Sequence, residues 1–322
     1  MNGVVTIKDV AKHAGVSVAS VSRYINKNGY VRTETGKKIA EAIQALDYVP
    51  NEVARSLFQK KSKIIGVLLP DIANPYFPLL AKGIEETLIK NGYMMLLANT
   101  SDSEEQLNQY ITTFIQNNVS GIITALPIKA LPDVSVVGID RVYEGDINKV
   151  LPDDYLGGKL IGEEILKTAF KNILIITGSL SFNSAKKRLE GLTDVLDTKT
   201  TNYEIYETST FNVNEVDKIS DAFFEQYPLV DTVIASNDYL ALKIMQKAQQ
   251  RGMSIPENLQ IIGYDGIPFA DMTYPKLTTI KQPVYEIGEM AADVMIQMLT
   301  GENTRSLQKI LPVSLQKGES LR

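Results

Sequence analysis

Residues 6–26 read T-I-K-D-V-A-K-H-A-G-V-S-V-A-S-V-S-R-Y-I-N, and their spacing predicts two short helices joined by a tight turn. Thr6 and Asp9 offer the paired caps that begin a helix. Gly15 predicts the end of that helix, and Ser17 predicts the cap of the second. Apolar side chains recur at helical spacing in both segments, at Ile7, Val10, Ala11, Ala14, Val21 and Ile25.

A third helix is expected beyond the Asn28-Gly29 turn, capped by Thr33 and carrying Ile39, Ile43 and Leu46 on its inner face. Three short helices, with a glycine turn between the first two, indicate a helix-turn-helix head. In that motif the second helix lies in the major groove of DNA. A small helical bundle without any role on DNA would show the same spacing.

The charge of the head differs from that of the rest of the chain. Residues 1–63 contain 11 Lys and Arg against 5 Asp and Glu, a balance of +6. Because the 322 residues together carry −5, the remainder carries −11. A basic head on an acidic body suggests a polyanionic partner for the head alone. A basic surface that is merely solvated is the alternative.

Side chains on the predicted second helix suit the edges of base pairs and the phosphates. Val18 and Ala19 are small enough for close approach and can contact thymine methyl groups. Arg23, one turn on, can donate two hydrogen bonds to guanine O6 and N7. Ser17, Ser22 and Asn26 are neutral groups of the kind that contact phosphates.

The same stretch, followed by L-D-Y-V-P-N-E-V-A-R-S-L at residues 46–57, resembles the head of the lactose/galactose repressor family. The resemblance implies that Val18, Ala19 and Arg23 stand at base-reading positions. The lactose repressor itself has polar readers where Val18 and Ala19 stand, so a lactose-type operator is not implied. The DNA-binding residues that we expect are Thr6, Ser17, Val18, Ala19, Ser22, Arg23, Asn26, Asn51, Ala54 and Leu57.

Residues 50–63 are expected to form a hinge helix and linker. Pro50 suits the first turn of a helix, and residues 51–58 are too few to form a helix that is stable alone. In the family, two such helices pair across a dimer, and each inserts a leucine between base steps in the minor groove. Leu57 matches that leucine, an apolar wedge of the kind that kinks DNA. Without the resemblance, Leu57 would be assigned to packing.

The acidic body alternates strands with helices. Helices are expected at residues 78–91 and 104–117, and Gly157, Gly158 and Gly162 indicate a turn that leads into a helix. Alternation of this kind predicts parallel sheets covered on both faces, and two series predict two lobes with a ligand beyond the strand ends. The expected strands are residues 64–69, 93–98, 121–124, 136–140, 172–177, 232–236 and 259–264.

Aromatic, amide, carboxylate and guanidinium side chains follow these strands, as in a sugar pocket. Each one alone could be a cap, a turn or a surface group. The body resembles the periplasmic sugar-binding fold that the repressor family shares, and this implies an effector site. Its residues are Asn74, Tyr76, Phe77, Asp140, Arg141, Arg188, Phe211, Asn237, Asp265 and Gln282.

Four stretches, N-E-V-A-R-S-L, N-P-Y-F-P, S-N-D and I-I-G-Y-D-G-I-P, resemble the ribose operon repressors of Gram-positive bacteria. Effector choice in the family changes with a few pocket residues. Tyr76 and Phe77 would also suit a flat purine, as in the purine-responsive branch.

The expected fold class is a small all-α helix-turn-helix head plus an α/β periplasmic-binding-protein-like core of two parallel-sheet lobes. Residues 1–49 form the head, and residues 64–322 form the effector-binding and dimerisation domain. Its N-lobe is expected at about 64–155 and 284–308, and its C-lobe at about 156–283 and 309–322.

The residue types present argue against an enzyme. The chain has no cysteine, which excludes disulfides, thiolate nucleophiles and zinc sites built on sulfur. Its only histidine, His13, is expected to face solvent in the head, so the crevice cannot hold a Ser-His-Asp triad or a two-histidine metal site. Neither a dinucleotide fingerprint nor a Walker A pattern is present. We therefore expect no cofactor and no metal.

The function expected is that of a homodimeric repressor of a carbohydrate-utilisation operon, released by a small sugar such as ribose. Its partners would be double-stranded operator DNA, the sugar and a second copy of the chain. The lack of a signal peptide or membrane-spanning run predicts a soluble cytoplasmic protein without a membrane partner. No heptad tail follows the core, which favours a dimer over a tetramer.

Three alternatives stay open. One is a purine-responsive repressor, and another is a catabolite-control regulator whose co-repressor is a phosphorylated carrier protein. The third is a sugar-binding protein or enzyme without a role on DNA.

Overall fold

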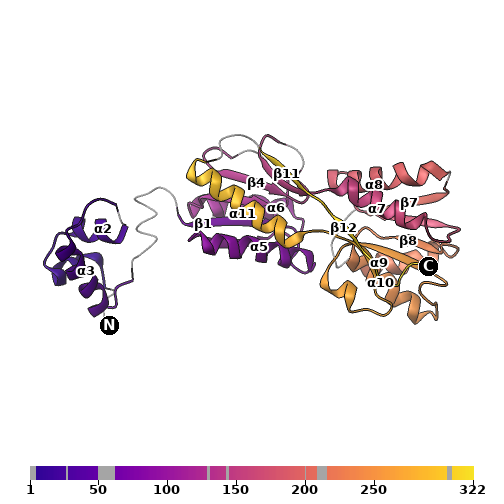
Figure 1. Cartoon of the computed structure of the whole chain (residues 1–322), viewed down its shortest axis with the longest axis horizontal. Helices are drawn as coiled ribbons and strands as arrows, with labels where there is room; N and C mark the ends of the chain where they lie inside the picture. Colours follow the sequence, from indigo (N-terminus) through magenta and orange to yellow (C-terminus); the bar gives the residue numbers. More distant parts are fainter. Residues whose placement is uncertain are drawn as a thin grey trace. The chain divides into compact units, whose positions relative to one another are not determined.

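A computed structural model describes residues 5–26, 28–49, 62–128, 131–142, 145–199, 201–208, 216–302 and 307–322. The chain divides into two compact units, Met1–Ser62 and Lys63–Arg322 (Figure 1). Residues 50–61 of the predicted hinge helix and linker, among them Pro50, Asn51, Ala54 and Leu57, lie outside the described residues. No described helix has both the length and the apolar character needed to cross a membrane.

The first unit contains the three helices expected from the sequence, α1 (Ile7–Ala14), α2 (Val18–Asn26) and α3 (Thr33–Ala45). The Asp9 carboxylate accepts hydrogen bonds from the backbone N–H of Thr6 at 2.9 Å and from its hydroxyl at 2.6 Å, which confirms the predicted cap. Gly15 ends α1 with a φ of 66°, in the left-handed region that favours glycine. The helix-turn-helix prediction is therefore confirmed.

A small apolar core holds these helices together. Its buried members are Val10, Ala11, Ala14, Val21, Ile39 and Ala42, and Ile7, Ile25, Ile43 and Leu46 pack against them. The predicted cap of α3 is wrong by one residue, because Arg32 takes the N-cap position and Thr33 is already helical.

The second unit begins with the N-lobe, a sheet of six strands in which every pairing is parallel. Helices α5 (Tyr76–Lys90) and α11 (Val284–Thr300) pack against each other on one face, and α6 (Glu104–Gln116) covers the other. The strand order is β11 (Gln308–Leu311), β5 (Asn148–Pro152), β4 (Ser135–Ile139), β3 (Gly121–Thr124), β1 (Ile64–Leu69) and β2 (Met94–Asn99).

Strand β1 shows why its sequence is an uninterrupted apolar run. Ile65 and Val67 point into the core beside α5 and α11, whereas Leu68 points into the core beside α6. Because successive side chains alternate between two covered faces, both sets must be apolar.

The C-lobe is a second sheet of six strands, with the order β12 (Ser314–Gln316), β10 (Thr278–Lys281), β9 (Gln260–Asp265), β8 (Thr232–Ile234), β6 (Ile173–Thr177) and β7 (Tyr203–Glu207). Its helices are α7 (Asp154–Ile165), α8 (Asn183–Leu196), α9 (Val216–Gln226) and α10 (Asp238–Gln250), with short 3-10 helices at Asp197–Lys199 and Pro268–Asp271. Helices α7 and α8 cover one face, and α9 and α10 cover the other.

The expectation of parallel sheets holds for every pairing in this lobe except one. Strand β12 runs antiparallel to β10. The chain enters β12 directly from β11, which belongs to the other sheet, and no helix lies between the two strands. A parallel strand is usually reached through a crossover helix, and β12 has none before it. The chain also changes sheets between β5 and α7 and between β10 and α11.

The expected turn at Gly157, Gly158 and Gly162 is wrong, because all three lie inside α7. A Cβ atom on Gly158 would collide with the backbone carbonyl of Arg188, and one on Gly191 with that of Tyr155. The glycines therefore allow α7 and α8 to pack backbone against backbone. This contact brings the start of α7 next to the middle of α8.

Candidate functional site

The outer face of α2 carries the side chains predicted to read DNA. Ser17, Ala19 and Arg23 are exposed, and Val18 is 41% exposed although it is apolar. The Ser17 hydroxyl accepts a hydrogen bond from the Ser20 backbone N–H at 3.2 Å, which confirms it as the cap of α2.

The remaining polar residues of this predicted surface are partly engaged within the head. Ser22 and Asn26 are half-buried, and the Asn26 amide donates to the Ser22 hydroxyl at 3.2 Å. Thr6 is exposed, with its hydroxyl on Asp9. Asp9 has a lowered pKa because of these bonds from Thr6. His13 is exposed on α1, as predicted.

In the second unit, a cleft lies where the carboxyl ends of the two sheets meet. Asn74 follows β1, Asp140 and Arg141 follow β4, Asn237 follows β8, and Asp265 ends β9. Asp140 has a φ of 54° and Asp265 a φ of 114°, conformations that are uncommon for residues other than glycine. Strained backbone of this kind is held in place by its surroundings and concentrates at binding sites.

The residues of the cleft surround about 350 Å³ of space, part of which is open solvent. Eight of the ten residues predicted to bind an effector line it, together with Ser184. Gln282 lies directly behind, where its amide donates to the Asp265 carboxylate at 2.8 Å. Phe211 lies outside the described residues. The lining side chains are Asn74, Tyr76, Phe77, Asp140 and Arg141 from the N-lobe and Ser184, Arg188, Asn237 and Asp265 from the C-lobe.

On the N-lobe side, Arg141 is held by two carboxylates and two aromatic rings. Its guanidinium donates to Asp102 at 2.9 Å and lies 3.5 Å from the Asp140 carboxylate. Its central carbon lies 5.0 Å from the ring centroid of Phe182 and 5.9 Å from that of Phe77. Since Phe182 precedes α8 of the C-lobe, this guanidinium contacts both lobes.

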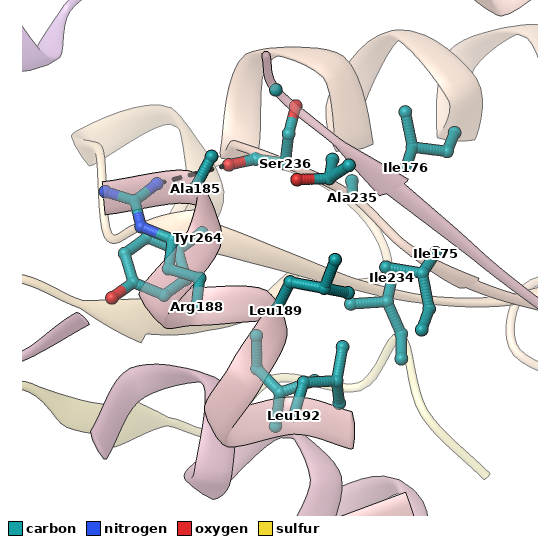
Figure 2. A pocket seen from close by; sticks show the side chains of 13 residues that line it. Ile175, Ile176, Ala185, Arg188, Leu189, Leu192, Ile234, Ala235, Ser236 and Tyr264 are labelled. Carbon is teal, nitrogen blue, oxygen red and sulfur yellow. Dashed lines mark hydrogen bonds between the residues drawn. The ribbon is translucent and has the colours of Figure 1, made fainter. Parts of the chain in front are cut away.

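On the C-lobe side, Arg188 of α8 has a similar arrangement. Its Nε donates to the Asp154 carboxylate at 2.6 Å, and its central carbon lies 3.8 Å from the ring centroid of Tyr264. Figure 2 shows the guanidinium beside Tyr264, with a bond of 3.5 Å to the Ser236 carbonyl. Leu189, on the same helix, lines an apolar pocket next to Arg188 and packs against the core of the C-lobe.

Burial changes the acid–base properties of this cleft. It raises the pKa of Asp265 to about 7, although the Arg188 charge opposes the shift. Burial also raises the pKa of Asp140, and the positive charges of Arg141 and Arg188 reduce this upward shift. The pKa of Arg188 is well above its ordinary value because Asp154 and other neighbours outweigh the effect of burial.

Two amide side chains at the cleft differ in how they are used. The Asn237 oxygen accepts from the Leu240 backbone N–H at 2.8 Å and caps α10, while the residue lines the cleft. Gln282 is 3% exposed, and no described residue donates a hydrogen bond to its oxygen. A buried acceptor of this kind is costly unless a ligand or water donates to it.

Sequence reasoning missed several side chains that shape the cleft, among them Asp102, Asp154, Ser184 and Tyr264. Asp102 follows β2, so the rule that found Asp140 and Asp265 would have found it too. Ser184 lies four residues before Arg188, on the same face of α8. Asp154 follows β5, a strand that was not predicted, and no local signal marked it. Among the described residues, no cluster of three or more His, Cys, Asp or Glu side chains could hold a metal ion.

Comparison with protein-family models gives two matches that together span nearly the whole chain. Residues 6–51 match the model of bacterial regulatory proteins of the lacI family. Residues 62–318 match the model of periplasmic binding proteins and the sugar-binding domain of the LacI family.

Individual relatives agree with these matches. The ribose operon repressor of Bacillus subtilis (strain 168) is 40% identical over 314 residues, which cover 96% of each chain. A LacI family transcriptional regulator from Enterococcus faecium, solved with bound ribose, has a TM-score of 0.72 and 30% identity over 80% of this chain and 98% of its own. The lac repressor dimer bound to operator and the anti-inducer ONPF has a TM-score of 0.87 and 25% identity, with 99% of both chains covered.

Proposed function

Because the chain belongs to the LacI family of DNA-binding bacterial repressors, we propose that it controls a carbohydrate-utilisation operon and responds to ribose bound in the cleft between its lobes. The observation that carries this proposal is the composition of the cleft. Guanidinium, carboxylate and amide groups surround it, with the rings of Tyr76 and Phe77 at one wall. Planar polar groups bind neighbouring hydroxyls in pairs, and rings pack against the C–H faces of a sugar.

Ribose is supported over other sugars by two kinds of relative. The Bacillus subtilis relative is named a ribose operon repressor, and the Enterococcus faecium regulator has ribose bound.

For the head, we assign operator recognition to the exposed face of α2. Val18 and Ala19 would approach base edges, Arg23 would read guanine, and Ser17, Ser22 and Asn26, with Thr6 on α1, would contact phosphates. In the hinge, Asn51 and Ala54 would line the minor groove and Leu57 would enter it. Two copies of the chain would bind the two half-sites of a near-palindromic operator, in the cytoplasm where the DNA lies.

The two functions are joined through the lobes. Residues from both lobes line the cleft, so a sugar bound there favours the closed arrangement. The sugar weakens operator binding because it binds the released state of the protein more tightly than the DNA-bound state. The ratio of these two affinities sets the size of the effect. The protein acts by binding alone, without catalysis.

Fluorescence anisotropy with labelled duplexes from the chromosomal neighbourhood of the gene tests this proposal. One duplex should bind at moderate salt, and ribose should release it, whereas sucrose, fructose and hypoxanthine should not. Release by hypoxanthine alone would favour the purine-responsive alternative. Binding to no duplex, with or without these compounds, would refute the proposal.

A further inference from the structure

The Asp154 side chain is fully buried behind Arg188. Its exposed fraction is 0%, compared with 16% for the Arg188 side chain that it contacts. One of its oxygens, Oδ1, accepts from Arg188 Nε at 2.6 Å and from the Tyr264 hydroxyl at 3.2 Å. Asp154 is not among the residues that line the cleft. Its most direct route to a ligand in the cleft is therefore through Arg188, which does line it.

Arg188 is fixed in direction by this contact. The carboxylate occupies its Nε, the Tyr264 ring lies against its face, and the Ser236 carbonyl lies 3.5 Å from one terminal nitrogen. The close packing of α7 on α8 keeps Asp154 and Arg188 together, because Gly158 leaves no side chain between the helices. The guanidinium is thus presented to the cleft in one orientation.

The charge of Arg188 is also balanced before any ligand arrives. Among the described residues at the cleft, the guanidinium groups of Arg141 and Arg188 each contact a carboxylate, from Asp102 and Asp154 respectively. Asp140 and Asp265 add two further acidic groups. If Asp140 and Asp265 are both protonated, the carboxylates of Asp102 and Asp154 still cancel the charges of the two guanidinium groups. The net charge of these six groups is then zero. A phosphate dianion would lose its hydration there without gaining an uncompensated cation.

We propose that Asp154 is a positioning residue that makes the cleft selective for an uncharged sugar over the same sugar carrying a phosphate. It does so by holding Arg188 as a directed hydrogen-bond donor whose charge is already neutralised. This inference rests on the proposed function, since it concerns the same cleft. The effector would then be the free sugar, which is the substrate of the phosphoryl transfer that forms the sugar phosphate, and not the product of that reaction.

The matched variants are Asp154→Asn and Glu190→Gln. Asparagine keeps the size and the accepting oxygen of Asp154 but removes its charge. Glu190 lies on the same helix as Arg188, with 50% of its side chain exposed in an ion pair to Lys187, so its variant removes one negative charge at the surface. Thermal unfolding verifies that each variant is folded.

Isothermal titration of the full-length protein with ribose and with ribose 5-phosphate, and with glucose and glucose 6-phosphate as a second pair, measures the selectivity. The wild type should prefer the free sugar by about 100-fold or more. Asp154→Asn should reduce that ratio about tenfold or more, since it removes the carboxylate in direct contact with the Arg188 charge. Glu190→Gln should leave the ratio unchanged. If Asp154→Asn does not fold, Tyr264→Phe, which removes only the hydroxyl bond to Asp154, should shift the ratio in the same direction by less.

The outcomes separate this inference from the proposed function. A wild type that binds ribose 5-phosphate as tightly as ribose, or an Asp154→Asn protein with an unchanged ratio, would overturn the role of Asp154 and leave a sugar-responsive repressor. Binding of no sugar in either form would overturn both.

Discussion

The substitution Asp265→Asn should stabilise the unliganded protein, although it removes a residue of the proposed sugar site. Burial raises the pKa of this carboxyl from 3.8 to about 7, because the charged form loses its hydration in the cleft. The folded state therefore binds the proton more tightly than the unfolded state does. Stability is lost as the pH rises from about 4 to 7, and the loss is complete above 7.

The size of the effect follows from that shift. About three pH units at 1.36 kcal/mol each amount to about 4 kcal/mol at pH 8, as an upper limit for one carboxyl. Asparagine resembles the protonated acid and can still accept from the Gln282 amide. For a body of this size, 4 kcal/mol corresponds to roughly 10 °C in melting temperature.

Thermal unfolding of the wild type and Asp265→Asn between pH 4.5 and 8.5 measures the effect. The difference in melting temperature should be largest above pH 7 and should shrink towards pH 4.5. Glu257→Gln, at an exposed position of the same lobe, is the control and should show no such trend. A difference that is independent of pH, or a variant less stable than the wild type at pH 8, would refute the reasoning.

Three further substitutions test separate parts of the molecule. Arg23→Ala should cost about 1–3 kcal/mol of specific operator binding in anisotropy titrations, and an unchanged affinity would disprove the assignment of α2 to base reading. Arg188→Ala should abolish the ribose response while operator affinity is retained, so a normal ribose response would place the effector elsewhere. Gly158→Ala should lower the melting temperature by several degrees, because the added Cβ meets the Arg188 carbonyl and must separate α7 from α8. An unchanged melting temperature would contradict that packing.

Much of the fold could be predicted because both faces of each central strand are covered. The apolar run at residues 64–69 is matched by β1, Ile64–Leu69. Strand β7, Tyr203–Glu207, was missed because it lies at the edge of its sheet and carries exposed Glu204 and Ile205. Such a strand has no continuous apolar sequence to reveal it.

The cleft was predictable to the extent that it follows strand ends. Asp140 and Asp265 were found because each lies at the end of an apolar run, at the carboxyl edge of its own parallel sheet. Asp154 was not found, because its position depends on how α7 packs against α8. That packing rests on Gly158 and Gly191, and glycines within a helix resemble a turn when only the sequence is read.

The central claim is that a sugar in the cleft and an operator on the head oppose each other within one protein. Linkage requires that ribose weaken operator binding by the same factor as the operator weakens ribose binding. The most direct test is the dissociation constant of ribose, measured by titration calorimetry with and without saturating operator duplex. We predict that the dissociation constant of ribose is at least about fivefold higher when the protein is bound to the operator than when it is free. The same factor should separate the operator affinities measured with and without saturating ribose. A ribose affinity that is the same in both cases would contradict the account.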